Sequence, residues 1–194
     1  MTKPDLHSRH QHLLQQLALY LQEAEQILAA WDTYSDKHTG PEGWPHDEEA
    51  YGFRQAQRDA DTWRSFNRIR SGASDLVATA EVQLQRLSGR TLNHRWAWQI
   101  GALRTAEERI GALQSDWLEL RATLPPSVRP GVEEYDGPLA GRNAEAWHYL
   151  DEWSLHGQAV LDIHSALRHT QFRPATAPVA ALPHRDSNPA KPRR

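Results

Sequence analysis

The chain has 194 residues, no cysteine and a formal net charge of −3. The lack of cysteine excludes disulfides, thiolate metal sites and cysteine nucleophiles, and it fits a reducing compartment. No apolar run approaches the roughly 18 residues of a membrane-spanning helix, and the polar first residues lack the apolar stretch of a signal peptide. We therefore expect a cytoplasmic protein with no membrane segment.

Charge is unevenly distributed along the chain. From Thr170 onward five basic residues stand against Asp186 alone, so this end carries +4 and the remainder carries −7. An acidic body is not the usual footprint of a nucleic-acid-binding protein. From Arg173 on, proline, alanine and basic residues dominate without periodicity. This composition predicts a helical domain over residues 1–172 and a disordered basic tail over residues 173–194.

The first predicted element is a long helix from about Lys3 to Trp31. Its apolar positions follow one another at alternating steps of four and three, which is the a/d seam of a heptad repeat. They are Leu6, His10, Leu13, Leu17, Tyr20, Ala24, Ile27 and Trp31. Glycines and prolines between Thr33 and His46 then predict a loop. We expect Trp44, inside this loop, to fold back over the end of the bundle.

A second helix is predicted to begin near Asp47, because the acidic residues that follow favour a helix N-terminus. Its seam starts as Phe53, Ala56, Ala60 and Trp63 and resumes as Ala73, Val77, Ala80, Leu84 and Leu87. Polar residues and Gly72 interrupt the heptad between the two rows. This predicts either one kinked helix or two helices that meet near Gly72. Because the link from Gly89 to Leu92 is short, we expect the helix after it to lie antiparallel to the helix before it, as a direct neighbour.

Two further long helices are predicted. The third runs from Asn93 to Leu124, where Pro125-Pro126 ends it, and its seam is Leu103, Ala106, Ile110, Leu113, Trp117, Leu120 and Leu124. After a loop to Arg142, the fourth runs from Asn143 to about Thr170, with Ala146, Leu150, Trp153, Gly157, Val160, His164 and Leu167 on its seam. The pattern predicts an all-α fold, an up-down-up-down antiparallel bundle of four long helices with coiled-coil-like packing.

The tryptophans are read as core residues rather than as a ligand cage. Six of the eight lie in or beside the seams, and helical spacing alone accounts for their positions. They are Trp31, Trp63, Trp96, Trp117, Trp147 and Trp153.

No catalytic or metal-binding motif is found. The eleven histidines include no H-x-x-x-H pair, and the single Glu-x-x-His match, Glu145 with His148, lacks the second copy that a di-metal bundle needs. The sequence also has no glycine-rich phosphate loop and no G-x-S-x-G. We therefore expect no cofactor, no metal site and no catalytic residue, and we read the chain as non-enzymatic.

Two sets of residues remain as candidates for function. Four arginines of the second helix, Arg54, Arg58, Arg64 and Arg68, fall within about a third of its circumference. They are a candidate contact for nucleic acid or an acidic partner, although Asp61 lies among them and a solvated, acid-paired face is the favoured interpretation. His164, on the seam of the fourth helix, is a candidate buried switch because imidazole titrates near neutrality.

Three functional hypotheses follow. The first is a non-enzymatic interaction protein that binds another protein or itself. The second is a nucleic-acid-associated regulator that uses the arginines and the basic tail. The third is an enzyme or binding protein for a small molecule or metal, with its site inside the bundle. A pocket lined by tryptophan and histidine would favour the third, a continuous positive face the second, and the absence of both the first.

Overall fold

The computed structural model describes residues 6–87 and 93–171. The regular elements in these ranges are all helices, which confirms the all-α prediction. They are α1 (Leu6–His38), α2 (Glu48–Phe66), the 3-10 helix η1 (Arg70–Gly72), α3 (Ala73–Arg86), α4 (Trp96–Thr123), α5 (Glu133–His156) and α6 (Gln158–Gln171). The predicted tail and the predicted link from Gly89 to Leu92 lie outside the described residues.

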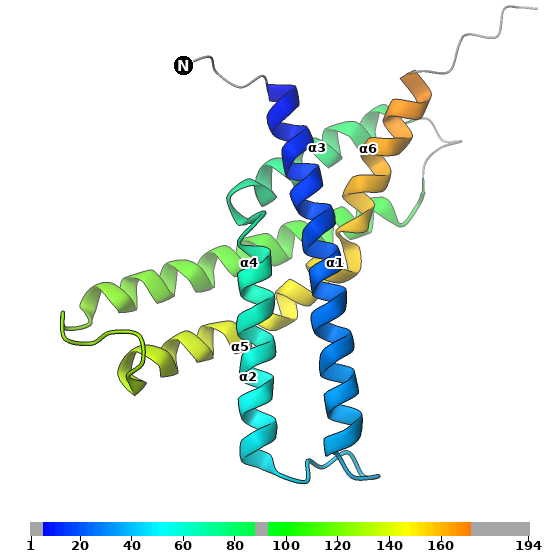
Figure 1. Cartoon of the computed structure of the whole chain (residues 1–194). Helices are drawn as coiled ribbons and strands as arrows, with labels where there is room; N and C mark the ends of the chain where they lie inside the picture. The colour runs from blue at the N-terminus through cyan, green and yellow to red at the C-terminus, as the bar shows by residue number, and fades with distance from the viewer. Residues whose placement is uncertain (1–5, 88–92, 172–194) are drawn as a thin grey trace, which may run out of the picture.

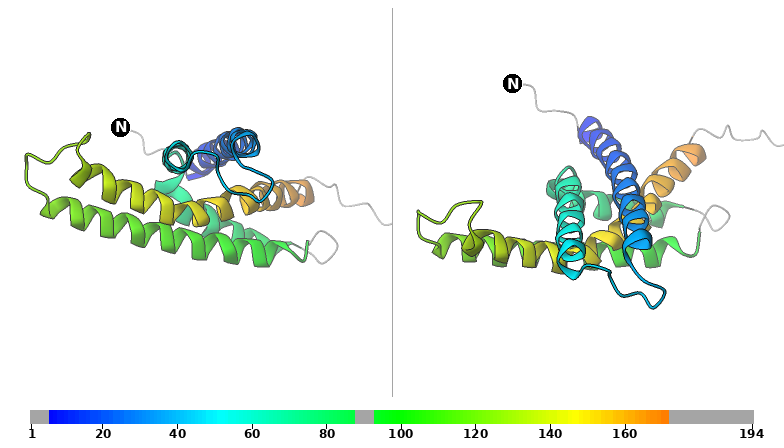
Figure 2. Two further views of the ribbon diagram at one scale, coloured as in Figure 1. Left: turned by 90° about the horizontal axis from the view of Figure 1, so that it is seen from below. Right: turned by 60° about the horizontal axis from the view of Figure 1, so that its bottom comes forward.

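The helices form two crossed hairpins. α1 and α2 lie side by side and are joined through residues 39–47, and α4 and α5 lie side by side in a second layer (Figure 1). Figure 2 shows the α1–α2 pair lying across the α4–α5 pair, with α2 packed on α5. α3 and α6 pack against each other and against α4. This arrangement of six α-helices differs from the expected bundle of four long ones.

Three large side chains form the core where the two hairpins cross. Tyr20 of α1, Phe66 of α2 and Trp153 of α5 are all fully buried. The Phe66 ring lies 5.4 Å from each of the other two rings, in edge-on geometry, which is the favoured arrangement for aromatic pairs. The Tyr20 hydroxyl donates a 2.8 Å hydrogen bond to the Leu150 carbonyl. Burial raises the pKa of the Tyr20 phenol well above its ordinary value.

Most buried residues of α3, α4 and α5 lie on the predicted seams, and α1 buries the middle of its seam at Leu17, Tyr20 and Ala24. The predicted seam of α2 is only partly right. Trp63 is buried, whereas Phe53 is 75 % exposed. The buried face of α2 is instead centred on Thr62 and Phe66. Phe53 is nine residues from Thr62, which at about 100° per residue places it on the opposite side of the helix. The heptad spacing of apolar residues therefore predicted correctly that α2 is a helix, but it predicted the wrong face of this helix as the buried one.

The interruption near Gly72 is a separate short element. α2 ends at Phe66, η1 covers Arg70–Gly72, and α3 begins at Ala73. A Cβ atom on Gly72 would lie 2.4 Å from Leu13 Cδ2. Glycine at this position therefore allows α1 to pass close to the η1 turn.

α1 continues for seven residues past the predicted end at Trp31. The rings of Trp31, Tyr34 and His38 lie against one another along one face of the helix, with the Tyr34 and His38 centroids 3.9 Å apart. Tyr51 of α2 covers this face and its hydroxyl lies 2.9 Å from Ser35 Oγ. Because Tyr51 belongs to α2, periodicity within α1 alone could not show its contacts.

α5 begins ten residues before the predicted start at Asn143. The glycines and Pro138 between Gly131 and Gly141 suggested a loop, yet Pro138 lies within the helix. Glu133, Glu134 and Asp136 occupy the first turn, where negative charge favours a helix. Tyr135 packs edge-on against Trp117 of α4. Helix-dipole and packing energies thus outweigh the weak helix propensity of this segment.

The predicted fourth helix is divided at Gly157, where α5 ends and α6 follows almost directly. Gly157 has helical backbone angles, and its N–H donates to the Trp153 carbonyl. A Cβ atom here would lie 2.6 Å from the Trp153 carbonyl oxygen and 3.0 Å from Leu21 Cδ2. The glycine therefore lets α1 approach the joint closely.

The tryptophans divide into core and surface residues. Trp63, Trp96, Trp117 and Trp153 are buried, and Trp31 and Trp147 are half-buried. Trp44 is 73 % exposed, so the expectation that it closes the end of the bundle is wrong. In the part of the chain that the structure describes, no helix is both long enough and apolar enough to cross a membrane.

Candidate functional site: an arginine-lined groove between α1 and α2

A groove of about 490 Å³ runs between α1 and α2. All four arginines singled out in the sequence line it, which we therefore call the arginine groove. From α2 and the turn that follows it, the groove is lined by Arg54, Arg58, Asp61, Arg64, Ser65 and Arg68. From α1 it is lined by Glu23, Gln26, Ile27, Ala30 and Trp31, of which the last three are apolar. The site is therefore a row of cationic groups beside an apolar strip.

Arg58 is a structural residue rather than an exposed contact. Its side chain is only 9 % exposed and that of Asp59 only 2 %. The Arg58 Nε and Nη2 atoms donate hydrogen bonds of 2.9 and 2.6 Å to Asp59 Oδ1. The guanidinium lies between two indoles, 4.5 Å from the ring of Trp31 and 4.0 Å from that of Trp147. It therefore connects α1, α2 and α5.

Asp59 is a buried acid. Burial raises the pKa of its carboxyl group, while the hydrogen bonds and charge of Arg58 act in the opposite direction. A buried carboxylate without its cation is strongly unfavourable. The ion pair and the two indoles are therefore one unit, and loss of Arg58 would leave Asp59 uncompensated.

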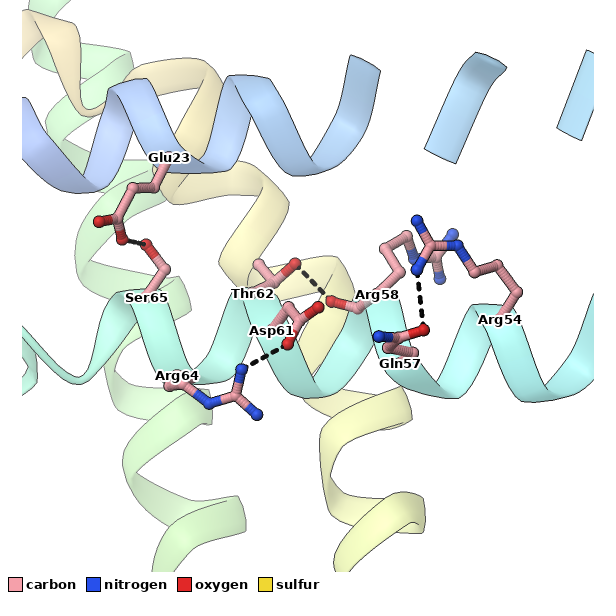
Figure 3. A network of polar contacts seen from close by, with 8 residues as sticks. All are labelled: Glu23, Arg54, Gln57, Arg58, Asp61, Thr62, Arg64 and Ser65. Carbon is pink, nitrogen blue, oxygen red and sulfur yellow. Dashed lines mark hydrogen bonds and ion pairs between the residues drawn. The ribbon is translucent and has the colours of Figure 1, made fainter. Parts of the chain in front are cut away.

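The other three arginines face the groove with ordinary surface partners. Figure 3 shows Arg54 donating to Gln57 Oε1 over 2.8 Å and Arg64 donating to Asp61 Oδ1 over 2.6 Å. Arg68 donates through Nε to Glu23 Oε2 over 3.1 Å and forms an ion pair with the same carboxylate. The acid-paired face favoured from the sequence thus describes Arg64 and Arg68, while Arg54 donates to a neutral amide.

Glu23 is the most heavily engaged acid of the groove. Ser65 Oγ donates to it over 2.7 Å (Figure 3). Arg68 donates to the same carboxylate. Hydrogen bonds from Arg68 and then from Ser65 lower the pKa of its carboxyl group. Glu23 is therefore ionised at neutral pH, and its hydrogen-bonding capacity is largely used within the protein.

His164, the candidate switch, lies where three helices meet and is half-buried. Its Nε2 is 3.2 Å from Gln11 Nε2 of α1, and its Nδ1 is 3.2 Å from Gln83 Nε2 of α3. The ring of His10 lies 5.3 Å away. The structure thus joins His164 to α1 and α3 and separates it from the arginine groove, and its role as a switch stays a prediction.

A second stacked arginine was not anticipated from the sequence. The Arg142 guanidinium of α5 lies 3.8 Å from the Trp63 ring of α2 and donates to Gln114 Oε1 and Asn143 Oδ1. Burial, and then the charge of Arg70, lower its pKa to about 10. Neither Trp147 beside Arg58 nor Trp63 beside Arg142 carries a local sequence signal, because each pair joins residues from distant elements.

Within residues 6–87 and 93–171, no three side chains of histidine, cysteine, aspartate or glutamate gather as a metal site would require. Searches with the sequence and the structure matched no protein-family model, no curated protein and no solved structure.

Proposed function

We propose that this chain is a non-enzymatic interaction protein that binds another protein through the arginine groove. The observation that carries the proposal is the lining of the groove. Guanidinium groups follow one side, and Ile27, Ala30 and Trp31 form an apolar strip on the other. Arginine and tryptophan are enriched where protein interfaces derive most of their binding energy. A cytoplasmic location remains part of the proposal.

Photo-crosslinking tests this proposal. A benzophenone amino acid replaces Gln26, which is exposed and lines the groove, in protein returned to extract of its own cells. The matched control carries the same group at Gln85, which is exposed on α3. We expect a protein adduct from position 26 that is absent from position 85. Identical adducts from both positions, or none from position 26, would contradict the proposal.

The same experiment includes substitutions that separate the groove from general charge. Arg54→Gln with Arg64→Gln removes two groove cations and should abolish the adduct. Arg104→Gln removes a half-exposed arginine that is paired with Glu81 outside the groove, and it should leave the adduct intact. Equal loss in both variants would indicate unspecific electrostatic attraction.

A nucleic-acid-associated regulator remains the second candidate, because the four predicted arginines do line one groove. Glu23 and Asp61 interrupt the row, which weakens its attraction for a polyanion. The test uses duplex DNA and RNA at low salt with a chain that ends at Arg173, so that the basic tail is removed. We expect little binding. Tight binding by the parent, with a log–log salt slope that falls by up to about 0.9 for each of Arg54, Arg64 and Arg68 replaced by glutamine, would promote this candidate.

A further inference from the structure

The shape of the arginine groove fits a helix. α1 and α2 run side by side in opposite directions (Figure 1). The groove is lined by residues of both helices. Arg54 and Arg64 are ten residues apart on α2, which at 1.5 Å per residue corresponds to about 15 Å. Arg68 follows four residues later, just past the end of α2 at Phe66, and lengthens the row further. An amphipathic helix of about four turns spans such a row, and a groove between two helices is a common seat for one.

The hydrogen-bonding capacity of the groove calls for a partner with acceptors. A guanidinium group has five N–H donors. Arg54 and Arg64 each make one hydrogen bond to a described side chain, and Arg64 is 76 % exposed. Glu23, in contrast, already accepts from both Ser65 and Arg68. The groove therefore offers many more donors than acceptors to whatever enters it.

The ion pairs already present do not block such a partner. The side chains of the Arg68–Glu23 pair are 43 % and 37 % exposed, and those of the Arg64–Asp61 pair are 76 % and 32 % exposed. Exposed ion pairs of this kind contribute little to stability. A carboxylate from outside can therefore replace Glu23 or Asp61 at the arginines with little loss.

From these features we propose that the groove receives an amphipathic helix of another protein, with its apolar stripe on Ile27, Ala30 and Trp31 and with carboxylates beside the stripe that bind Arg54, Arg64 and Arg68. This inference rests on the proposed function and specifies the chemistry of the partner. A phosphate backbone fits less well, because it has no apolar group for the strip from α1 and is repelled by Glu23 and Asp61.

The test uses two fluorescent, hydrocarbon-stapled helical peptides of about 15 residues, a length set by the helical rise. Both carry leucine at alternating steps of three and four. One carries glutamate beside the stripe, and the other carries glutamine at the same positions. Fluorescence anisotropy against the full chain should show the glutamate peptide binding about tenfold or more tightly than the glutamine peptide, because charge-assisted bonds to arginine are about twice as strong as neutral ones. Arg54→Gln with Arg64→Gln should remove most of this difference.

Substitution of Glu23, which already binds an arginine of the groove, tests the inference more specifically. Glu23→Gln removes the ion pair between Glu23 and Arg68, so that Arg68 is more available to a carboxylate of the peptide. The affinity for the glutamate peptide should therefore rise by about two- to fivefold, which corresponds to the free energy of an exposed ion pair. Glu81→Gln is the matched control, since it removes the same charge but leaves Arg104 of α4 without its partner, outside the groove. It should change the affinity by less than the Glu23 variant does. An equal effect of both variants would overturn the inference.

The remaining outcomes are equally decisive. Equal binding of the two peptides, or no binding of either, refutes an acidic helix as the occupant. If position 26 still forms a groove-dependent protein adduct in that case, the proposed function stands and only its partner chemistry falls. A dimer in sedimentation that disappears with Arg54→Gln and Arg64→Gln would assign the groove to a second copy, and groove-dependent binding of duplex DNA would assign it to nucleic acid. Both results would overturn the inference.

Discussion

Arginines of the same predicted row have different roles in this protein. Arg58 and Arg64 both lie in the predicted row and both pair with an aspartate, yet Arg58 is nearly buried between two indoles and Arg64 is largely exposed. The difference arises from α5, whose Trp147 covers Arg58. Sequence spacing identified the row but could not separate the structural arginine from those available to a ligand.

The first prediction compares these two arginines. Arg58→Gln should lower the free energy of unfolding by about 3–5 kcal/mol, because it leaves Asp59 buried without its cation. Arg64→Gln should cost at most about 1 kcal/mol, since its pair is exposed. Urea denaturation measures both values. Adding Asp59→Asn to the Arg58 variant should recover part of the loss, and similar stability for the two single variants would show that Arg58 is not structural.

At the scale of elements, glycines have opposite effects according to what surrounds them. Gly157 lies at the joint between α5 and α6 against Leu21, whereas Gly101 lies on the exposed face of α4 with nothing within 4 Å of an added Cβ atom. Both glycines stand in apolar helical sequence. Only the tertiary structure tells which of them is needed for close packing.

The second prediction uses this pair. Gly157→Ala should destabilise the protein by about 1–3 kcal/mol, because the new methyl group would overlap the Trp153 carbonyl oxygen and crowd Leu21. Gly101→Ala should instead stabilise it by up to about 1 kcal/mol through higher helix propensity. Thermal unfolding followed by circular dichroism checks both signs. A stabilising Gly157→Ala would mean that the joint is not tightly packed.

The sequence predicted most elements but not how they are placed. Periodicity predicted the helical class, most of the buried residues of α3, α4 and α5, and the buried middle of the α1 row, because each row depends only on spacing within its own helix. It misplaced the core face of α2, whose buried face includes Asp59, Thr62 and Ser65, so that apolar periodicity is weak there. It also missed the start of α5, where packing on α4 outweighs local signals. The arginine row was found because it is local, and its aromatic neighbours were missed because they are not.

At the scale of the whole molecule, the crossing of the hairpins leaves one end of the α1–α2 pair without a second layer. We call residues 32–38 and 48–57 the hairpin arm, which extends past α5 in Figure 1. None of the residues of the arm is buried. Earlier in α1, by contrast, Leu14, Leu17, Tyr20 and Ala24 are all buried. The arginine groove reaches the arm at Arg54.

The third prediction concerns the stability of this arm. Its backbone amides should exchange with deuterium at least about tenfold faster than those of residues 14–24 and 59–66, since local opening exposes little apolar surface there. Hydrogen exchange read by mass spectrometry on the free protein tests this. Uniform protection along α1 and α2 would show that the arm is as stable as the crossing.

The crossed topology also bears on the order in which the chain folds. Each hairpin joins neighbours in sequence, so α1 with α2, and α4 with α5, can pair at a small cost in loop-closure entropy. The contacts that join the layers are far apart in sequence, with 130 residues between Tyr20 and Leu150 and 153 between Gln11 and His164. Trp153, which completes the aromatic core, belongs to the last third of the chain. We therefore expect that, during synthesis, the α1–α2 pair leaves the ribosome before α5 has been made. Tyr20 and Phe66 then lack Trp153, which completes the aromatic core.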